Sequence, residues 1–232
     1  IDIMLAIDVS TSMLAEDLKP NRLEAAKDVA AEFINGRPND NIGITLFAGE
    51  TFTQCPLTVD HAVLLDMIHN IKCGLITDGT AVGMGIANAV TRLKDSKAKS
   101  KVIILLTDGT NNKGDISPMT AAEIAKSFGI RVYTIGVGTN GMAPYPYPVG
   151  NTVQYVSMPV EIDEKTLTEI AGTTDGNYFR ATSNSKLKEV YEEIDKLEKT
   201  KLNVKEYSKR DEEYHWFALA AFLCVLLEVL LR

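Results

Sequence analysis

The first residues with an evident chemical use are an aspartate and two serines at alternate positions near the start of the chain. Asp8, Ser10 and Ser12 follow the apolar run Ile3–Ile7, which is short and favours a β-strand. Ligands of open parallel α/β sheets bind at the carboxyl ends of strands, where these side chains would lie. The same residue types are also common in turns and caps, so this group alone does not establish a site.

Two further oxygen-bearing residues follow regular patterns later in the chain. Thr80 lies in the polar segment 76–81, and Asp108 follows the apolar run Val102–Leu106. The combined set offers two carboxylates and three hydroxyls, with no nitrogen or sulfur ligand. Mg²⁺ favours such oxygen ligands in near-octahedral coordination, with Mn²⁺ or Ca²⁺ as alternatives. The sequence therefore predicts a divalent-cation site made of Asp8, Ser10, Ser12, Thr80 and Asp108.

The elements that would position these residues alternate between strands and helices. Helical spacing of apolar residues predicts helices over 21–35, 61–70, 82–93, 119–128, 163–171 and 184–199. Strands are expected at 3–7, 41–48, 51–54, 101–106, 131–137 and 178–181. This alternation predicts an α/β fold, a Rossmann-like doubly wound and mostly parallel sheet with 51–54 as one antiparallel edge strand. Gly83 and Gly85 weaken the helix that contains them, which suggests close packing against the sheet.

Charge and cysteine usage narrow the function class. The chain has 24 Lys and Arg against 31 Asp and Glu, for a net charge of −7, so it lacks the basic footprint of a nucleic-acid-binding protein. Its cysteines and histidines are scattered, and no zinc site is expected. Cys55 and Cys73 are expected to be free buried thiols, with a disulfide between them as the alternative.

The three oxygen-bearing loops resemble those of the von Willebrand factor A (VWA) domain and its metal-ion-dependent adhesion site. Residues 8–12 resemble the family's Asp-x-Ser-x-Ser loop, Thr80 its threonine loop, and Asp108-Gly109 its Thr-Asp-Gly loop, within a domain over 1–198. The resemblance implies that the two serines and Thr80 bind the metal directly, while both aspartates often act through water. It also implies a binding module whose partner protein offers an acidic side chain to the metal.

Longer stretches resemble the BatA-type, membrane-anchored proteins of bacterial aerotolerance operons. These stretches are 55–58, 101–109, 131–138 and 160–164. The resemblance implies an aerotolerance or stress-related complex, with other VWA proteins and a MoxR-type ATPase system as partners. It further implies a place in the bacterial inner membrane, with the VWA domain outside the cytoplasm.

Two other functions compete with metal-dependent binding. The first is a structural scaffold with a vestigial metal site, and the second is an Mg²⁺-dependent hydrolase. Phosphoryl-transfer enzymes with an aspartate nucleophile require a second acidic residue two positions after it, and this chain has Ser10 at that position after Asp8. The sequence also lacks an evident general base and a Gly-x-Ser-x-Gly elbow. We therefore expect a protein that is not an enzyme.

A glycine-rich motif at 136–141 fits the pattern of a dinucleotide-binding loop but is rejected. Such a loop must open a helix, whereas the next segment, 142–148, carries three prolines at alternate positions and cannot start one. We expect 142–148 to be a solvated loop, with a partner-facing rim as the alternative. Asp78 is expected to form capping or loop hydrogen bonds, with support of the metal site as the alternative.

The C-terminal part predicts a membrane anchor. A charged linker over 199–213 precedes an expected transmembrane helix over 214–232, in which Trp216–Leu231 is apolar except for Glu228. A span needs about 20 residues, with about 17 as the lower limit, and Trp216 would be an interfacial anchor. A buried core helix is the alternative. The chain is expected to be a fragment, since it begins at Ile1 within a predicted strand.

Overall fold

Two neighbouring strands with almost uninterrupted apolar sequences form the centre of the sheet. In the computed structural model, which describes residues 1–108, 110–150, 152–207, 228 and 231, β1 (Asp2–Asp8) pairs in parallel with β4 (Lys101–Thr107). Every residue of β1 and all of β4 after Lys101 are buried. Such continuous burial is typical of strands that helices cover on both faces.

The other strands extend the sheet on both sides of this pair. The order is β3-β2-β1-β4-β5-β8, and each adjacent pair is parallel except β2 with β3. The added strands are β2 (Asn41–Phe47), β3 (Thr51–Thr58), β5 (Ile130–Val137) and β8 (Tyr178–Ala181). The predicted α/β architecture with one antiparallel edge strand is confirmed.

The edge strand β3 is longer than the predicted 51–54. It continues through Pro56 to Thr58, and its pairing with β2 shifts register at two points. Proline is tolerated on edge strands and at bulges, so Pro56 does not end the strand.

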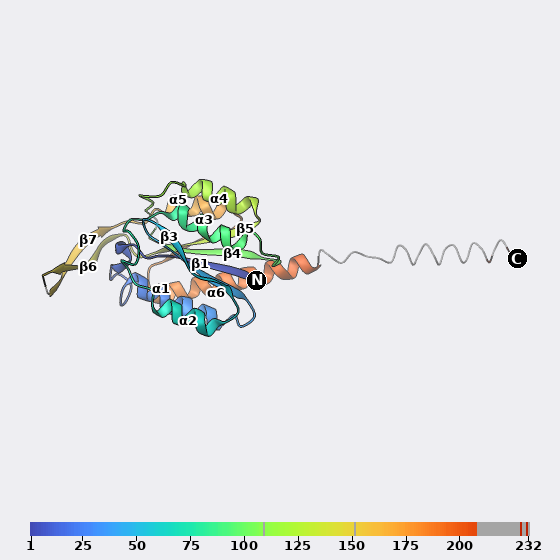
Figure 1. Ribbon diagram of the computed structural model, residues 1–232, viewed down its shortest axis with the longest axis horizontal. Helices are drawn as coiled ribbons and strands as arrows, with labels where there is room; N and C mark the ends of the chain where they lie inside the picture. The colour runs from blue at the N-terminus through green and yellow to red at the C-terminus, as the bar shows by residue number, and fades with distance from the viewer. Residues whose placement is uncertain (109, 151, 208–227, 229–230, 232) are drawn as a thin grey trace. The chain divides into compact units, whose positions relative to one another are not determined.

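Helices cover both faces of the sheet (Figure 1). One layer contains α1 (Arg22–Asn35), α2 (His61–His69) and the first part of α6 (Asn184–Tyr207), and the other contains α3 (Val82–Leu93), α4 (Pro118–Ser127) and α5 (Glu164–Thr173). A short 3-10 helix, η1 (Thr11–Leu14), follows β1. The predicted bounds of α1 to α5 agree within two residues, whereas α6 continues beyond residue 199 into the predicted linker.

The two glycines of α3 permit close approach to different neighbours. A β-carbon on Gly85 would lie 2.7 Å from the Phe47 ring of β2, so this glycine lets the helix approach the sheet as predicted. A β-carbon on Gly83 would lie 2.1 Å from the Ile116 carbonyl oxygen, in the segment before α4. Only one of the two glycines therefore serves the contact that the sequence suggested.

A separate antiparallel hairpin corrects the prediction of a solvated loop at 142–148. β6 (Gly141–Val149) pairs with β7 (Thr152–Val160) in a two-stranded sheet beside the carboxyl ends of the main strands (Figure 1). Along a strand, the backbone N–H groups of successive residues point to opposite edges. Three prolines at alternate positions therefore remove N–H donors from one edge of the strand only. The Pro144 carbonyl accepts a hydrogen bond from the Glu16 backbone, which places that edge away from β7. Three prolines are therefore compatible with β6.

The chain divides into two units, Ile1–Lys196 and Leu197–Arg232. The expected transmembrane helix at 214–232 falls outside the described residues, apart from Glu228 and Leu231. Within the described part of the chain, no helix has both the length and the apolar character needed to cross a membrane.

Candidate metal centre

The candidate centre lies where two parallel strands end next to each other. Asp8 is the last residue of β1, and Asp108 directly follows β4. The chain continues from β1 through α1 to β2 on one side, whereas β4 lies on the other side of β1. Open α/β sheets bind ligands at such a switch in strand order.

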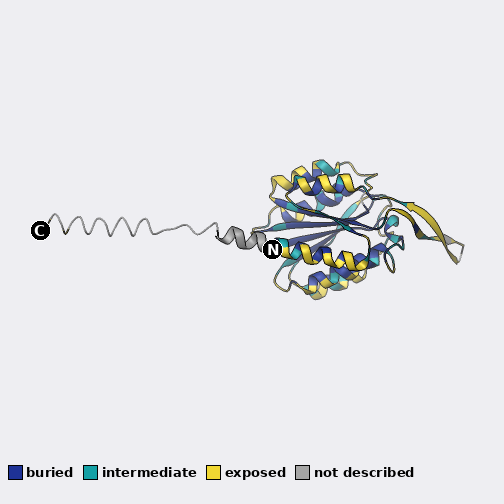
Figure 2. Cartoon of the chain, turned by 180° about the vertical axis from the view of Figure 1, so that it is seen from behind, coloured by how far each residue is buried: buried dark blue, intermediate teal, exposed yellow. Residues whose placement is uncertain are grey.

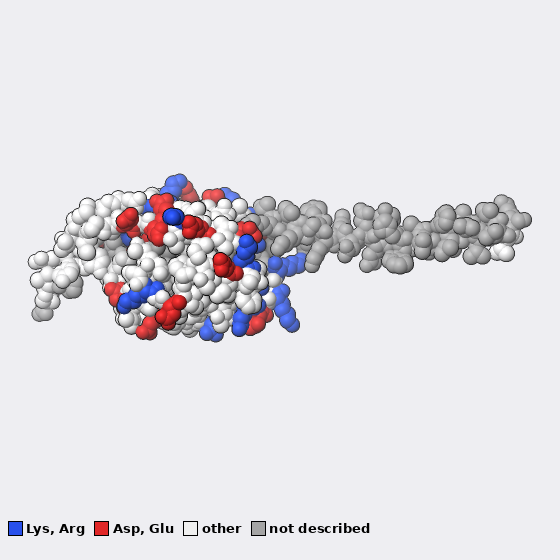
Figure 3. Space-filling model, turned by 90° about the horizontal axis from the view of Figure 1, so that it is seen from above, with Lys and Arg blue, Asp and Glu red and all other residues white. Residues whose placement is uncertain are grey.

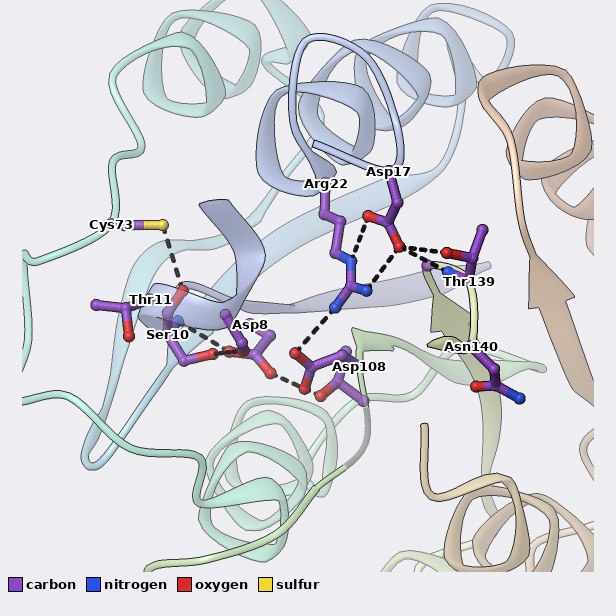
Figure 4. A network of polar contacts seen from close by, with 12 residues as sticks. Asp8, Ser10, Thr11, Asp17, Arg22, Cys73, Asp108, Thr139 and Asn140 are labelled. Atoms are coloured by element: carbon purple, nitrogen blue, oxygen red, sulfur yellow. Dashed lines mark hydrogen bonds and ion pairs between the residues drawn. The ribbon is translucent and has the colours of Figure 1, made fainter. Parts of the chain in front are cut away.

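Asp8 is fully buried and held by two hydrogen bonds. Its Oδ1 accepts from the Ser10 backbone N–H at 2.9 Å, and its Oδ2 accepts from the Thr107 hydroxyl at 2.6 Å. These bonds fix the carboxylate between the loop after β1 and the end of β4 (Figure 4).

The two serines contact each other beside the aspartates. Their hydroxyls lie 2.9 Å apart, and the Ser12 side chain lowers the pKa of the Asp108 carboxyl. Thr80 is held by Asn112, which donates its N–H to the Thr80 carbonyl and accepts from the Thr80 N–H at 2.9 Å. Thr80, Ser12 and Asp108 line one cavity of about 540 Å³. The structure thus links Asp8, Ser10 and Ser12 by hydrogen bonds, and it places Asp108 and Thr80 on the same cavity as Ser12.

Arg22, in the first turn of α1, is a buried member of the centre that the sequence did not reveal. Its Nε and Nη2 each donate to the carboxylate of Asp17 at 2.7 Å, and its Nη1 donates to Oδ2 of Asp108 at 3.3 Å (Figure 4). Asp17 in turn accepts hydrogen bonds from the backbone and hydroxyl of Thr139. A buried arginine gains from such forked contacts, because each carboxylate satisfies several donors.

Gly138 explains why the rejected glycine motif contains a glycine at this point. Its φ is +127°, and a β-carbon there would lie 2.5 Å from the guanidinium carbon of Arg22. The segment continues into a strand and not a helix, which confirms that the motif is not a dinucleotide-binding loop. The glycine makes space for Arg22.

Asp78 and Cys73 support the loop between the two serines. The Asp78 carboxylate accepts from the backbone and hydroxyl of Thr11 at 3.0 and 2.8 Å, so its hydrogen bonds are of the predicted loop type. The Cys73 thiol donates to the Ser10 carbonyl at 3.3 Å. Burial, followed by the charge of Asp8, raises the pKa of this thiol to about 12, which keeps it protonated. Cys73 is half-buried and Cys55 buried, and both are free.

The electrostatics of the centre favour a bound cation. Burial, and then the charge of Asp108, raises the pKa of Asp8 to about 7, against hydrogen bonds from Ser10 and Thr107 that lower it. Burial also raises the pKa of Asp108, although Ser12 and Arg22 act in the opposite direction. The Arg22 guanidinium pairs with Asp17 and Asp108, whereas Asp8 accepts hydrogen bonds from Ser10 and Thr107. When all three carboxylates are ionised, their charge exceeds that of the guanidinium by two. A divalent cation fits this charge and the oxygen donors.

Among the described residues, no group of three or more His, Cys, Asp and Glu side chains is arranged to hold a metal ion. The candidate centre has only two such side chains, Asp8 and Asp108, because hydroxyls supply three of its five predicted ligands.

Comparison with known proteins identifies the family. A model of the von Willebrand factor type A domain matches residues 2–193. The chain belongs to the VWA family. A protein of Borreliella burgdorferi is 29% identical over 97% of this chain and 67% of its own length. A UPF0353 protein of Mycolicibacterium paratuberculosis is 32% identical over 82% of this VWA chain. The chain spans 58% of the length of that mycobacterial relative.

Solved VWA structures extend the comparison. An aerotolerance-related membrane protein from Bacteroides fragilis is 34% identical, with a TM-score of 0.74 over 84% of this chain and 99% of its own. BatB from Bacteroides thetaiotaomicron is 35% identical, with a TM-score of 0.76 over 86% and 99%. The expected relationship to aerotolerance-related VWA proteins is thereby confirmed. A mussel byssus matrix protein with a zinc-occupied metal-ion-dependent adhesion site is 26% identical, with a TM-score of 0.66 over 84% and 45%.

Proposed function

We propose that this chain is the VWA module of a bacterial membrane protein that binds a divalent cation and, through it, a partner protein. One observation carries the proposal: Asp8 and Asp108 are buried at neighbouring strand ends, Ser12, Thr80 and Asp108 line one cavity, and a single arginine offsets only part of the negative charge. A buried charge without compensation is costly, so this arrangement favours a ligand of opposite charge.

The hydroxyls and the carboxylates of the centre would have different roles in cation binding. The hydroxyls of Ser10, Ser12 and Thr80 would hold the cation, and the carboxylates of Asp8 and Asp108 would supply negative charge around it. The cation, with Mg²⁺ as the first candidate, would offer positive charge to a ligand on the open side. An aspartate or glutamate of the partner matches that charge. The partner would therefore bind only when both the cation and the acidic side chain are present.

The setting of this interaction is proposed from the relatives. Similarity to an aerotolerance-related membrane protein and to BatB supports a role in a bacterial aerotolerance or stress-related complex. The apolar run Trp216–Leu231 supports a membrane anchor. We place the VWA domain outside the cytoplasm, with other VWA proteins and a MoxR-type ATPase system as candidate members of the complex.

Capture of a partner with and without the cation tests this function. The full chain, held in detergent, is immobilised and exposed to solubilised bacterial membranes in Mg²⁺ or in EDTA. A partner should be retained in Mg²⁺, released by EDTA and lost with Asp108→Asn. Asp66→Asn, at an exposed position of α2, is the matched control and should retain it. Partner capture that survives both chelation and Asp108→Asn would contradict the proposal.

A further inference from the structure

The β6–β7 hairpin is an exposed ribbon without a single charged residue. No Lys, Arg, Asp or Glu occurs between Gly141 and Val160. Nearly all of β7 is exposed (Figure 2), and this end of the molecule shows neither basic nor acidic side chains in the space-filling view (Figure 3). Exposed apolar patches of this kind on soluble domains mark interaction sites.

Register assigns the hairpin side chains to two faces. Residues directly opposite each other in an antiparallel pair share a face. The pair Tyr145–Val156 and the pair Ala143–Met158 therefore lie on one face, together with Tyr147. Tyr145, Tyr147 and Met158 line the 540 Å³ cavity. We call the face formed by these three residues the cavity face.

The cavity face and the candidate metal centre share that one cavity. Ser12, Thr80 and Asp108 line it together with Tyr147 and Met158. A partner residue that reaches the metal centre therefore has apolar hairpin side chains beside it. Tyr147 remains 55% exposed and Met158 41% exposed, so their apolar surface is available for burial against that partner.

The charges around the cavity restrict the partner further. Glu161 lies at the base of the hairpin and lines the cavity with Asp108, whereas Arg22 is already paired with Asp17 and Asp108. A second acidic group beside the one at the metal would be repelled by Glu161. Uncharged side chains would instead meet the cavity face.

We propose that the cavity face recognises large apolar side chains that flank the metal-binding carboxylate of the partner. The partner segment is then a single aspartate or glutamate with aromatic or aliphatic residues close to it in sequence. This inference rests on the proposed function, because the carboxylate requires the cation. Burial of Tyr and Met side chains would supply affinity that a lone carboxylate lacks, because association removes their apolar surface from water.

A peptide selection tests this inference without knowledge of the natural partner. A library of random displayed peptides is bound to the full chain in detergent with Mg²⁺, and peptides released by EDTA are collected. The affinities of the collected peptides are then measured for two double variants. Tyr147→Ser with Met158→Ser removes the two exposed side chains of the cavity face. Met142→Ser with Val153→Ser, the control, removes two exposed apolar side chains from the other face.

The expected peptides carry one acidic residue next to aromatic or aliphatic residues. The cavity-face variant should bind them at least about tenfold more weakly, equivalent to about 1.4 kcal/mol, and the other-face variant should bind them normally. EDTA-released peptides without apolar enrichment, or with unchanged affinity for the cavity-face variant, would overturn this inference but not the proposed function. Absence of any EDTA-released peptide would overturn both.

A second measurement separates self-association from partner binding. Sedimentation of the full chain over a range of concentrations should give the same oligomeric state for the wild type and the cavity-face variant. Self-association that disappears in Tyr147→Ser with Met158→Ser would instead assign the cavity face to a second copy of the chain and overturn the inference.

Discussion

The guanidinium of Arg22 donates a hydrogen bond of 3.3 Å to the carboxylate of Asp108, which joins the first turn of α1 to the loop after β4. The same guanidinium forms two bonds of 2.7 Å with Asp17. Arg22 therefore holds one carboxylate of the candidate centre and reduces the negative charge around it. Stability and metal affinity should respond to this residue in opposite directions.

Replacement of Arg22 by Gln should destabilise the fold and strengthen metal binding. Removal of one member of a buried ion pair costs about 3–5 kcal/mol, and chemical denaturation with EDTA measures this loss. Loss of the positive charge leaves Asp108 freer to attract a cation, so calorimetry should give a lower dissociation constant for Mg²⁺. Lys188→Gln removes an exposed pairing with Glu32 and should leave stability nearly unchanged. Weaker metal binding in Arg22→Gln that still folds would contradict this role.

Asp17 should make the fold sensitive to acid. Burial alone would raise its pKa, but hydrogen bonds from Arg22 and Thr139 lower the pKa below the ordinary value. A carboxyl whose pKa is lower in the folded than in the unfolded state stabilises the fold above its unfolded-state pKa, which is about 4 for aspartate. This contribution is lost as the pH falls through the folded-state pKa. Urea unfolding in EDTA should show a difference between wild type and Asp17→Asn at pH 7 that shrinks below about pH 4. A difference independent of pH would contradict this.

Asp8→Asn should stabilise the metal-free protein. Burial and the charge of Asp108 raise the pKa of Asp8 to about 7, so at pH 7 the unfolded state ionises more readily than the folded state. One unit of pKa shift corresponds to about 1.4 kcal/mol, and we expect a gain of at least about 1 kcal/mol in EDTA. The gain should vanish near pH 4, where the unfolded chain also becomes protonated. A metal-free variant less stable than wild type at pH 7 would argue for a structural role.

Gly138→Ala should disrupt the support of Arg22. A β-carbon at Gly138 would lie 2.5 Å from the guanidinium carbon, so the variant must displace Arg22 from Asp17 or Asp108. Gly141 has a similar φ of +114° but no atom within 4 Å of its added β-carbon, so Gly141→Ala controls for backbone strain. Thermal unfolding should show a larger loss for Gly138→Ala. Equal losses would mean that strain alone is responsible.

The predictable parts of the fold are those whose burial produces a regular pattern of apolar residues in the sequence. Burial on both faces requires the unbroken apolar run of β4, and acids at the ends of β1 and β4 are visible as oxygen-rich breaks after such runs. The metal loops follow from the same signals. Whether Asp8, Ser10, Ser12, Thr80 and Asp108 bind a cation stays a prediction.

Other features depend on contacts that local sequence does not encode. Arg22 reads as an ordinary charged residue near a helix start, because its burial comes from Asp17, Asp108 and Gly138. The hairpin was missed because its three prolines indicate a loop, although they fall on the edge that faces away from β7. The available signals were the dipeptide Gly150-Asn151, which is typical of hairpin turns, and the β-prone run Thr152–Val156 after it.

Calorimetric titration of the full chain with Mg²⁺ tests the central claim most directly. We predict binding of one ion at millimolar or lower concentration, a large loss of affinity in Asp8→Ala and Asp108→Ala, and milder losses in Ser10→Ala, Ser12→Ala and Thr80→Ala. Loss of a hydroxyl ligand should weaken binding less than loss of a carboxylate, because replacement of an aspartate by alanine removes a full negative charge from beside the cation. Circular dichroism would verify that all five variants remain folded. Absence of binding at millimolar Mg²⁺, or unchanged binding in both aspartate variants, would contradict the account.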